Sequence, residues 1–213
     1  MTDMNVDWKK TALLVIDMQN DFILPGGPMY IPMGASVVPA IKEAVDFARE
    51  KGAFVVWVVR EHDKYGRDVE LFRRHLYGEG KEKPTTKGTK GADLVEGLVI
   101  QEGDYKLVKT RFSAFFATNL HTLLQGAGIT SVVVVGVQTP NCIRQTVFDA
   151  VAHDYYPVIV LSDATAAKTP EVHTALCYKH SVEDFFCLTA NLIDMCNVGV
   201  QTPTLCAWSG KDV

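Results

Sequence analysis

The sequence predicts an α/β fold in three layers (α/β/α) around a six-stranded, mostly parallel sheet with strand order 3-2-1-4-5-6. Apolar runs of strand length, such as SVVVVGV at 131–137, are typical of strands that are covered on both faces. Segments with apolar residues at helical spacing alternate with these runs. This alternation predicts right-handed crossovers and helices on both faces of the sheet.

The first half of the chain supplies two of the strands. Residues 11–17 form a buried strand that ends in Asp17, and a proline- and glycine-containing loop follows it. Residues 35–51 carry an apolar stripe at helical spacing, and Gly52 suits the position just beyond a helix. The run AFVVWVV at 53–59 is the second buried strand.

Residues 60–103, which we call the excursion, have weak periodicity, many charges and several glycines. A segment of this length inside a compact domain is more often functional than idle. We therefore expect the excursion to shape or cover a site. The remaining predicted elements are strands at 105–109, 131–137, 157–163 and 185–188, and helices at 112–128, 140–153 and 170–180.

Composition indicates one globular domain over residues 1–213, with a possible C-terminal arm from about residue 199 that packs on its own body or on another subunit. A net charge of −4 and the absence of a basic cluster argue against a nucleic-acid partner. No apolar run reaches the length of a membrane span, and the N-terminus lacks a signal-peptide core. Five cysteines without Cys-x-x-Cys spacing predict free thiols and a cytoplasmic location.

The segment from Gly136 to Cys142 follows the most apolar strand and begins a predicted helix. Thr139 suits the N-cap and Pro140 the first helical position, which places Cys142 in the first turn. The helix dipole there favours an anion, so we expect the thiol to ionise more readily than a free cysteine. The alternative is that Cys142 is a small buried residue packed between helix and sheet.

In a sheet of the predicted order, ligands bind at the C-terminal strand ends where the order reverses, between the first and fourth strands. Asp17 and Cys142 should therefore face each other across this crevice. Three motifs converge on the same edge: Asp17-x-Gln19-x-Asp21-Phe22, Lys109-x-Arg111-Phe112-Ser113-Ala114-Phe115, and Gly136-Val137-Gln138-Thr139-x-x-Cys142. In this order, from about residue 11 to 188, they resemble the isochorismatase-like cysteine hydrolase superfamily.

The resemblance implies a catalytic triad of Asp17, Lys109 and Cys142. Cys142 would attack a carbonyl, Asp17 would transfer the thiol proton to the leaving amine, and Lys109 would hold and tune the pair. A thioester acyl-enzyme would follow and be hydrolysed by water. The resemblance also implies a cis peptide at Val137–Gln138 and an oxyanion hole formed by the backbone N–H groups of Gln138 and Cys142.

Other residues of the motifs and of the early excursion are candidates for substrate binding. The aromatic members are equally consistent with core packing, and Arg111 with pairing to an acidic neighbour. Gln138 departs from the small residue often found in the family, so it bears on substrate choice. The candidates are Gln19, Phe22, Arg60, His62, Arg111, Phe112, Phe115 and Gln138.

Nicotinamidases of this superfamily carry an Asp-x-His metal pair after the second strand, whereas this chain reads Arg60-Glu61-His62-Asp63 there. His62 and His75 remain candidate zinc ligands, but solvated loop histidines are the more common case. The resemblance thus favours no metal and no cofactor. Arg60-x-His62 followed by Asp68-x-Glu70-x-x-Arg73 is more similar to amidases acting on ureidoacrylate, biuret or N-carbamoylsarcosine.

We therefore predict a cytoplasmic, metal-independent cysteine amidohydrolase that cleaves a C–N bond of a small amide or ureido compound. Its partners would be a small-molecule substrate and copies of itself in a homo-oligomer, with neither nucleic acid nor membrane involved. Two alternatives remain: a nicotinamidase-like, metal-dependent amidase, and a catalytically silent scaffold or binding protein that keeps the fold.

Overall fold

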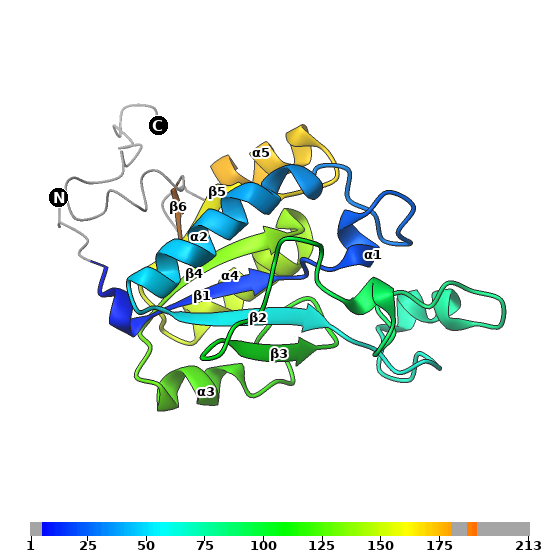
Figure 1. Ribbon diagram of the computed structural model, residues 1–213, viewed down its shortest axis with the longest axis horizontal. Helices are drawn as coiled ribbons and strands as arrows, with labels where there is room; N and C mark the ends of the chain where they lie inside the picture. Colours follow the sequence, from blue (N-terminus) through cyan, green and yellow to red (C-terminus); the bar gives the residue numbers. More distant parts are fainter. Residues whose placement is uncertain (1–5, 180–186, 191–213) are drawn as a thin grey trace, which may run out of the picture.

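A computed structural model describes residues 6–179 and 187–190 of the chain. Its parallel sheet has the strand order β3-β2-β1-β4-β5-β6, so the predicted order is confirmed. In Figure 1 the arrowheads of the central strands point toward α1 and the excursion. The strands are β1 (Thr11–Ile16), β2 (Phe54–Arg60), β3 (Tyr105–Lys109), β4 (Ser131–Val137), β5 (Val158–Ala166) and β6 (Cys187–Ala190).

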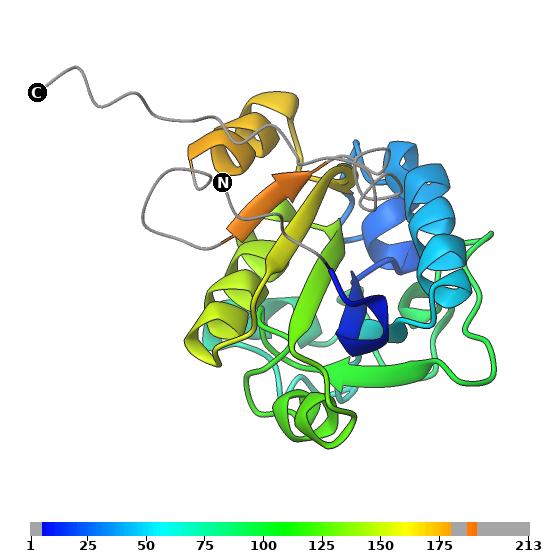
Figure 2. The same ribbon diagram turned by 90° about the vertical axis from the view of Figure 1, so that its left-hand side faces the viewer.

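Helices cover both faces of this sheet, as Figure 2 shows, with α2 on one face and α3 and α4 on the other. The α-helices are α1 (Asn20–Ile23), α2 (Val38–Glu50), α3 (Leu120–Gly126), α4 (Arg144–Ala152) and α5 (Pro170–Lys179). Short helical turns are η1 (Trp8–Lys10), η2 (Ala35–Val37), η3 (Leu71–Tyr77), η4 (Lys90–Ala92) and the π-helical turn η5 (Thr139–Ile143).

The strand side chains divide between two apolar clusters because successive residues of a strand point to opposite faces. Leu13 of β1 belongs to the cluster that contains Ile41 of α2. Its neighbour Leu14 belongs to the cluster that contains Leu124 of α3 and Ala150 of α4. The central strands are thus buried on both faces, which explains their continuous apolar runs.

The predicted helix at 112–128 is wrong in its first half, since α3 begins only at Leu120. Side chains in the preceding segment bond to its backbone instead: Ser113 Oγ accepts from Phe115 N, and Thr118 Oγ1 donates to Ala114 O. Such local hydrogen bonds compete with a helix. The fifth strand extends three residues beyond its predicted end, and the sixth begins two residues after its predicted start.

Strands β1 and β4 approach closely at the C-terminal edge of the sheet. Gly136 has φ of 111°, and a Cβ at this position would lie 2.1 Å from the backbone oxygen of its partner Ile16. A glycine is therefore required here for both backbone conformation and space. The next residues along the two strands lead directly to Asp17 and to Val137–Gln138.

Within the described residues, no helix is long and apolar enough to cross a membrane. The predicted C-terminal arm from about residue 199 lies outside the described part of the chain.

Candidate active site

The three residues of the predicted triad lie together at the C-terminal edge of the sheet. Lys109 Nζ donates to Asp17 Oδ2 at 2.8 Å and to Cys142 Sγ at 3.3 Å. It also donates to Arg111 O at 3.0 Å. Asp17 and Lys109 are each 1% exposed and Cys142 is 5% exposed, so the ionic pair is held away from solvent.

Asp17 is held in its position by the backbone on both sides. It adopts the left-handed conformation with φ of 53°, which is uncommon for a residue other than glycine. Its N–H donates to Val58 O, and its carbonyl oxygen accepts from Gln19 N. These bonds turn the chain sharply after β1, so the carboxylate lies beside Lys109.

Cys142 lies in the π-helical turn η5 that precedes α4. The predicted N-cap is wrong: Gln138 occupies that position without a side-chain cap, and Thr139 Oγ1 is instead hydrogen-bonded to His173 Nδ1 at 2.8 Å. The Val137–Gln138 peptide is cis. The carbonyl of Gln138 accepts from the N–H groups of Asn141 and Ile143, which closes the turn around the cysteine.

The expectation that Cys142 ionises readily is also wrong for the free protein. Burial and the nearby Asp17 carboxylate raise the pKa of the Cys142 thiol above its ordinary value, although Lys109 and Arg60 act in the opposite direction. Loss of water around the thiolate outweighs the helix-dipole effect on which the prediction depended. A base is therefore needed to generate the nucleophile.

The pH dependence of alkylation tests this electrostatic balance. We expect alkylation of Cys142 by iodoacetamide to be slow at neutral pH and to accelerate above the range of ordinary cysteines, because only the thiolate reacts. Asp17→Asn removes a repelling charge and should move the profile to lower pH. Asp46→Asn, which neutralises an exposed carboxylate, should leave it unchanged. Mass spectrometry of the Cys142 peptide measures the alkylation rate. If the rate in the protein without substitutions is already maximal at neutral pH, this balance would be contradicted.

Arg60 brings a second buried cation to the thiol. It is the last residue of β2, where the strand register pairs it with Lys109, and its side chain is 2% exposed. Nη2 lies 4.0 Å from Cys142 Sγ, and Nη1 donates to both carboxylate oxygens of Glu70. Burial opposes its charge, but Cys142, Asp17 and Glu70 raise the pKa of Arg60 above its ordinary value.

His62 lies next to Arg60, in the segment after β2 where a nicotinamidase would carry its Asp-x-His metal ligands. Its Nε2 is 3.3 Å from Arg60 Nη1, and its Nδ1 is 3.2 Å from Asp68 Oδ1. Burial and Arg60 lower the pKa of His62 to about 4. His75 is exposed on η3, and the described residues contain no group of three or more metal-ligating side chains. A guanidinium beside the imidazole does not fit a metal site.

Three of the predicted substrate-binding residues make contacts within the protein itself. The Gln19 amide donates to Arg60 O and Ala92 O and accepts from Arg60 N, so it positions the end of β2. Arg111 Nη1 donates to the backbone oxygens of Asp68 and Thr110. Phe115 packs against His153 and Tyr155 beyond the far end of α4 and belongs to the core.

The other three predicted residues lie beside Arg60 or at the start of η5. The Phe112 ring lies 5.8 Å from the Arg60 guanidinium and 5.1 Å from that of Arg73. Gln138 is half-buried at the start of η5. Phe22 lines a small pocket together with Arg60 and His62.

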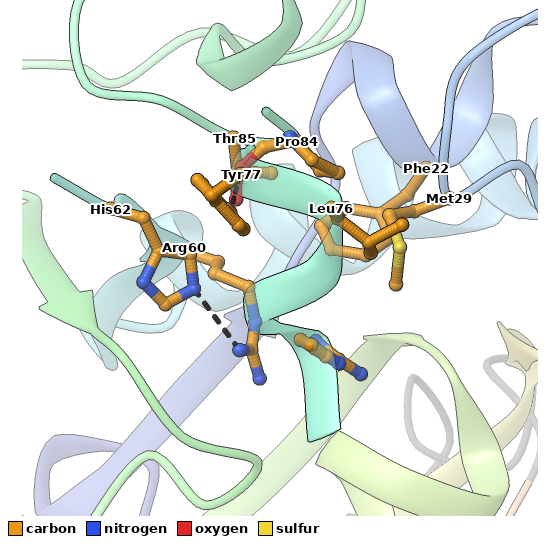
Figure 3. Close-up of a pocket in the computed structure, with 9 residues that line it drawn as sticks. Phe22, Met29, Arg60, His62, Leu76, Tyr77, Pro84 and Thr85 are labelled. Atoms are coloured by element: carbon orange, nitrogen blue, oxygen red, sulfur yellow. Dashed lines mark hydrogen bonds between the residues drawn. The ribbon is translucent and has the colours of Figure 1, made fainter. Parts of the chain in front are cut away.

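Figure 3 shows this pocket, which we call the Arg60 pocket. Residues from the excursion form most of its wall. Arg73 belongs to a motif of the sequence, whereas Tyr77 and Thr85 carry no local signal, because glycines and charges obscure the periodicity of the excursion. The lining residues are Phe22, Met29, Arg60, His62, Arg73, Leu76, Tyr77, Pro84 and Thr85.

Comparison with known protein families shows which family this chain belongs to. The isochorismatase domain model matches residues 11–182, which include the sheet edge, the triad and the excursion. The chain belongs to the isochorismatase family. The sequence-based recognition of this superfamily is therefore confirmed.

Individual relatives extend over nearly the whole chain. A protein of Arabidopsis thaliana named "Probable inactive nicotinamidase" is 59% identical, covering 95% of this chain and 96% of that protein. Ureidoacrylate amidohydrolase RutB of Rhizobium rhizogenes is 31% identical, covering 92% and 86%. A crystal structure of an isochorismatase family protein from Desulfovibrio vulgaris matches with a TM-score of 0.84 at 40% identity, covering 90% and 99%.

Proposed function

We propose that this isochorismatase family member is a cysteine amidohydrolase that cleaves the C–N bond of a small amide or ureido compound. The observation that carries the proposal is the contact of Lys109 Nζ with both Asp17 and the Cys142 thiol inside a buried site. Core packing alone does not require a carboxylate, an ammonium and a thiol in mutual contact. A nucleophile, a base and an orienting cation do require this arrangement.

In the proposed reaction, Asp17 removes the proton of Cys142 as sulfur attacks the substrate carbonyl carbon. Lys109 engages Oδ2 of Asp17, which leaves Oδ1 available as the proton acceptor. The backbone N–H groups of Gln138 and Cys142 stabilise the oxyanion, and Lys109 keeps Asp17 in place. Collapse breaks the C–N bond, and Asp17 returns the proton to the leaving nitrogen.

The resulting thioester is then hydrolysed. Water adds its oxygen to the acyl carbon while Asp17 takes one of its protons, and the C–S bond breaks with the proton returning to the sulfur. The raised pKa of the Cys142 thiol agrees with this scheme, because the full catalytic cycle begins and ends with a protonated Cys142 and passes through the thioester between the two half-reactions. No metal takes part in either step.

The names of the relatives support amide hydrolysis, and one of them also supports a protein without catalytic activity. RutB is named for the hydrolysis of a ureido compound, which favours a ureido or carbamoyl substrate. The Arabidopsis relative is named as an inactive nicotinamidase, which favours a catalytically silent binding protein as the second candidate. Nicotinamidase activity is the weaker choice because Arg60 lies beside His62. Cytoplasmic location and homo-oligomer formation stay predictions.

An ammonia-release screen tests the proposal. We expect turnover with one or more ureido acids, biuret or small amides, unchanged by a chelator, and little with nicotinamide. When the reaction is stopped during turnover with excess substrate, the Cys142 peptide should carry the added mass of the acyl group. Adducts confined to Cys177, Cys187, Cys196 or Cys206 would overturn the assignment. Binding of these compounds without turnover would favour the silent candidate, and chelator-sensitive hydrolysis of nicotinamide would favour the metal-dependent one.

A further inference from the structure

We propose that Arg60 is a catalytic residue whose guanidinium group stabilises the negative charge that develops on the Cys142 sulfur. This charge develops twice in the proposed reaction. It appears when Asp17 takes the thiol proton during attack, and again when the C–S bond of the thioester breaks and the sulfur leaves with the bonding electrons before Asp17 returns a proton to it. The inference rests on the proposed function, because it assigns a further residue to the same reaction.

The contact between the guanidinium group and the sulfur is the first support. Nη2 of Arg60 lies 4.0 Å from Cys142 Sγ. Arg60 is 1% exposed and Cys142 is 5% exposed, so little water separates or screens the two groups. A cation in such a place attracts a thiolate much more strongly than a neutral thiol. Arg60 is therefore placed to stabilise the charged stages of the reaction more than the resting state.

The other terminal nitrogen of Arg60 anchors the side chain. Nη1 lies 3.1 and 3.3 Å from the two carboxylate oxygens of Glu70 and 3.4 Å from Thr110 O. His62 Nε2 is 3.3 Å from the same nitrogen, as Figure 3 shows. Burial and Arg60 lower the pKa of His62 to about 4, so its ring is neutral at neutral pH and can accept a hydrogen bond. These contacts leave Nη2 beside the sulfur.

The backbone of Arg60 is fixed as well. The Gln19 side-chain amide donates to Arg60 O and accepts from Arg60 N, each at 2.7 Å. Arg60 ends β2 and is paired in register with Lys109 of β3. A charge that is held rigidly by its surroundings does not have to reorganise when the opposite charge develops next to it. The guanidinium group is thus preorganised for the thiolate.

Electrostatics around the site agree with this geometry. Cys142 and Asp17 raise the pKa of Arg60, and Arg60 acts to lower the pKa of the Cys142 thiol against the larger effect of burial. Each of the two groups therefore favours the charged form of the other. The alternative is that Arg60 only joins the excursion to the sheet through Glu70. That role needs the ion pair with Glu70 but no effect on the thiol.

The experiment removes the cation without leaving an unpaired carboxylate. In Arg60→Gln/Glu70→Gln both members of the ion pair become neutral amides. Alkylation of Cys142 by iodoacetamide at neutral pH should slow roughly tenfold or more in this double variant, with its pH profile moved to higher pH, because the thiolate loses a cation. Arg60→Lys keeps a cation and should recover much of the rate. Glu70→Gln alone should slow it far less, and Arg67→Gln, which alters an exposed arginine, should leave it unchanged.

Steady-state kinetics separate stabilisation of the sulfur from substrate binding. With a substrate identified by ammonia release, kcat of the double variant should fall roughly 100-fold while KM changes little, because the lost interaction forms only as charge develops. A rise in KM with unchanged kcat would overturn the inference, since Arg60 would then only bind the substrate. Arg67→Gln should again behave as the original protein.

The alkylation measurement also separates failure of this inference from failure of the proposed function. If the protein hydrolyses no amide, a slower and shifted alkylation profile in the double variant still supports the action of Arg60 on the thiol. An alkylation profile equal to that of the original protein, in a variant that circular dichroism shows to be folded, would overturn the inference even where hydrolysis is observed. If the double variant does not fold, Arg60→Gln gives the same comparison, because Arg73 remains 4.0 Å from Glu70.

Discussion

Replacing Cys142 by alanine is expected to abolish amide hydrolysis, with kcat falling by roughly 10⁴-fold or more. In the proposed function the thiol forms the acyl intermediate, because its nucleophilic sulfur contacts both Lys109 and Arg60. Steady-state kinetics on a substrate identified by ammonia release would measure the effect. Residual activity above a tenth of the original would contradict the mechanism.

The control for this substitution is Cys177→Ala, which removes a thiol from α5 and should leave kcat unchanged. Circular dichroism and a thermal melt should show that Cys142→Ala remains folded. Because a buried sulfur is being exchanged for a methyl group, a modest loss of stability is expected and does not count against the result.

Replacing Lys109 by methionine is expected to lower the free energy of unfolding by about 3–5 kcal/mol. The substitution keeps much of the side-chain volume but leaves the Asp17 carboxylate buried without its counterion. Loss of the 2.8 Å contact would remove the ammonium group that is hydrogen-bonded to the Asp17 carboxylate. Urea denaturation measures the change.

The double variant Asp17→Asn/Lys109→Met tests the cause of this loss. Removing both charges should recover a large part of the stability, because the uncompensated carboxylate no longer exists. Activity should stay absent in both variants. If Lys109→Met alone unfolds within about 1 kcal/mol of the original protein, the buried pair would not have the energetic role assigned to it.

The strands of the fold were predictable where a continuous apolar run determines the local structure. Continuous apolar runs at 11–16 and 131–137 can be satisfied only by burial on both faces, and the parallel topology then follows. The segment at 112–119 was mispredicted because Ser113 and Thr118 bond to nearby backbone, a choice that apolar spacing does not reveal.

The spatial grouping of the three candidate residues was predictable, but the electrostatics around them were not. Strand-end positions brought Asp17, Lys109 and Cys142 to one edge, as the motifs implied. The raised pKa of Cys142 depends on its burial and on the charges of Asp17, Lys109 and Arg60, which lie on other strands and loops, so its position in the helix alone was misleading. The left-handed conformation of Thr85 likewise depends on tertiary contacts with Asp21 and His62, which the local sequence does not reveal.

The location of the Arg60 pocket has a consequence for redesign. Most of its wall, from Arg60 to Thr85, belongs to one continuous stretch of chain, whereas Asp17 follows β1 and Cys142 lies in η5. The sheet edge tolerates little change, since Gly136 has no room for a side chain. We therefore expect that exchanging residues 61–85 between family members would change the wall of this pocket while Asp17, Lys109 and Cys142 stay in place.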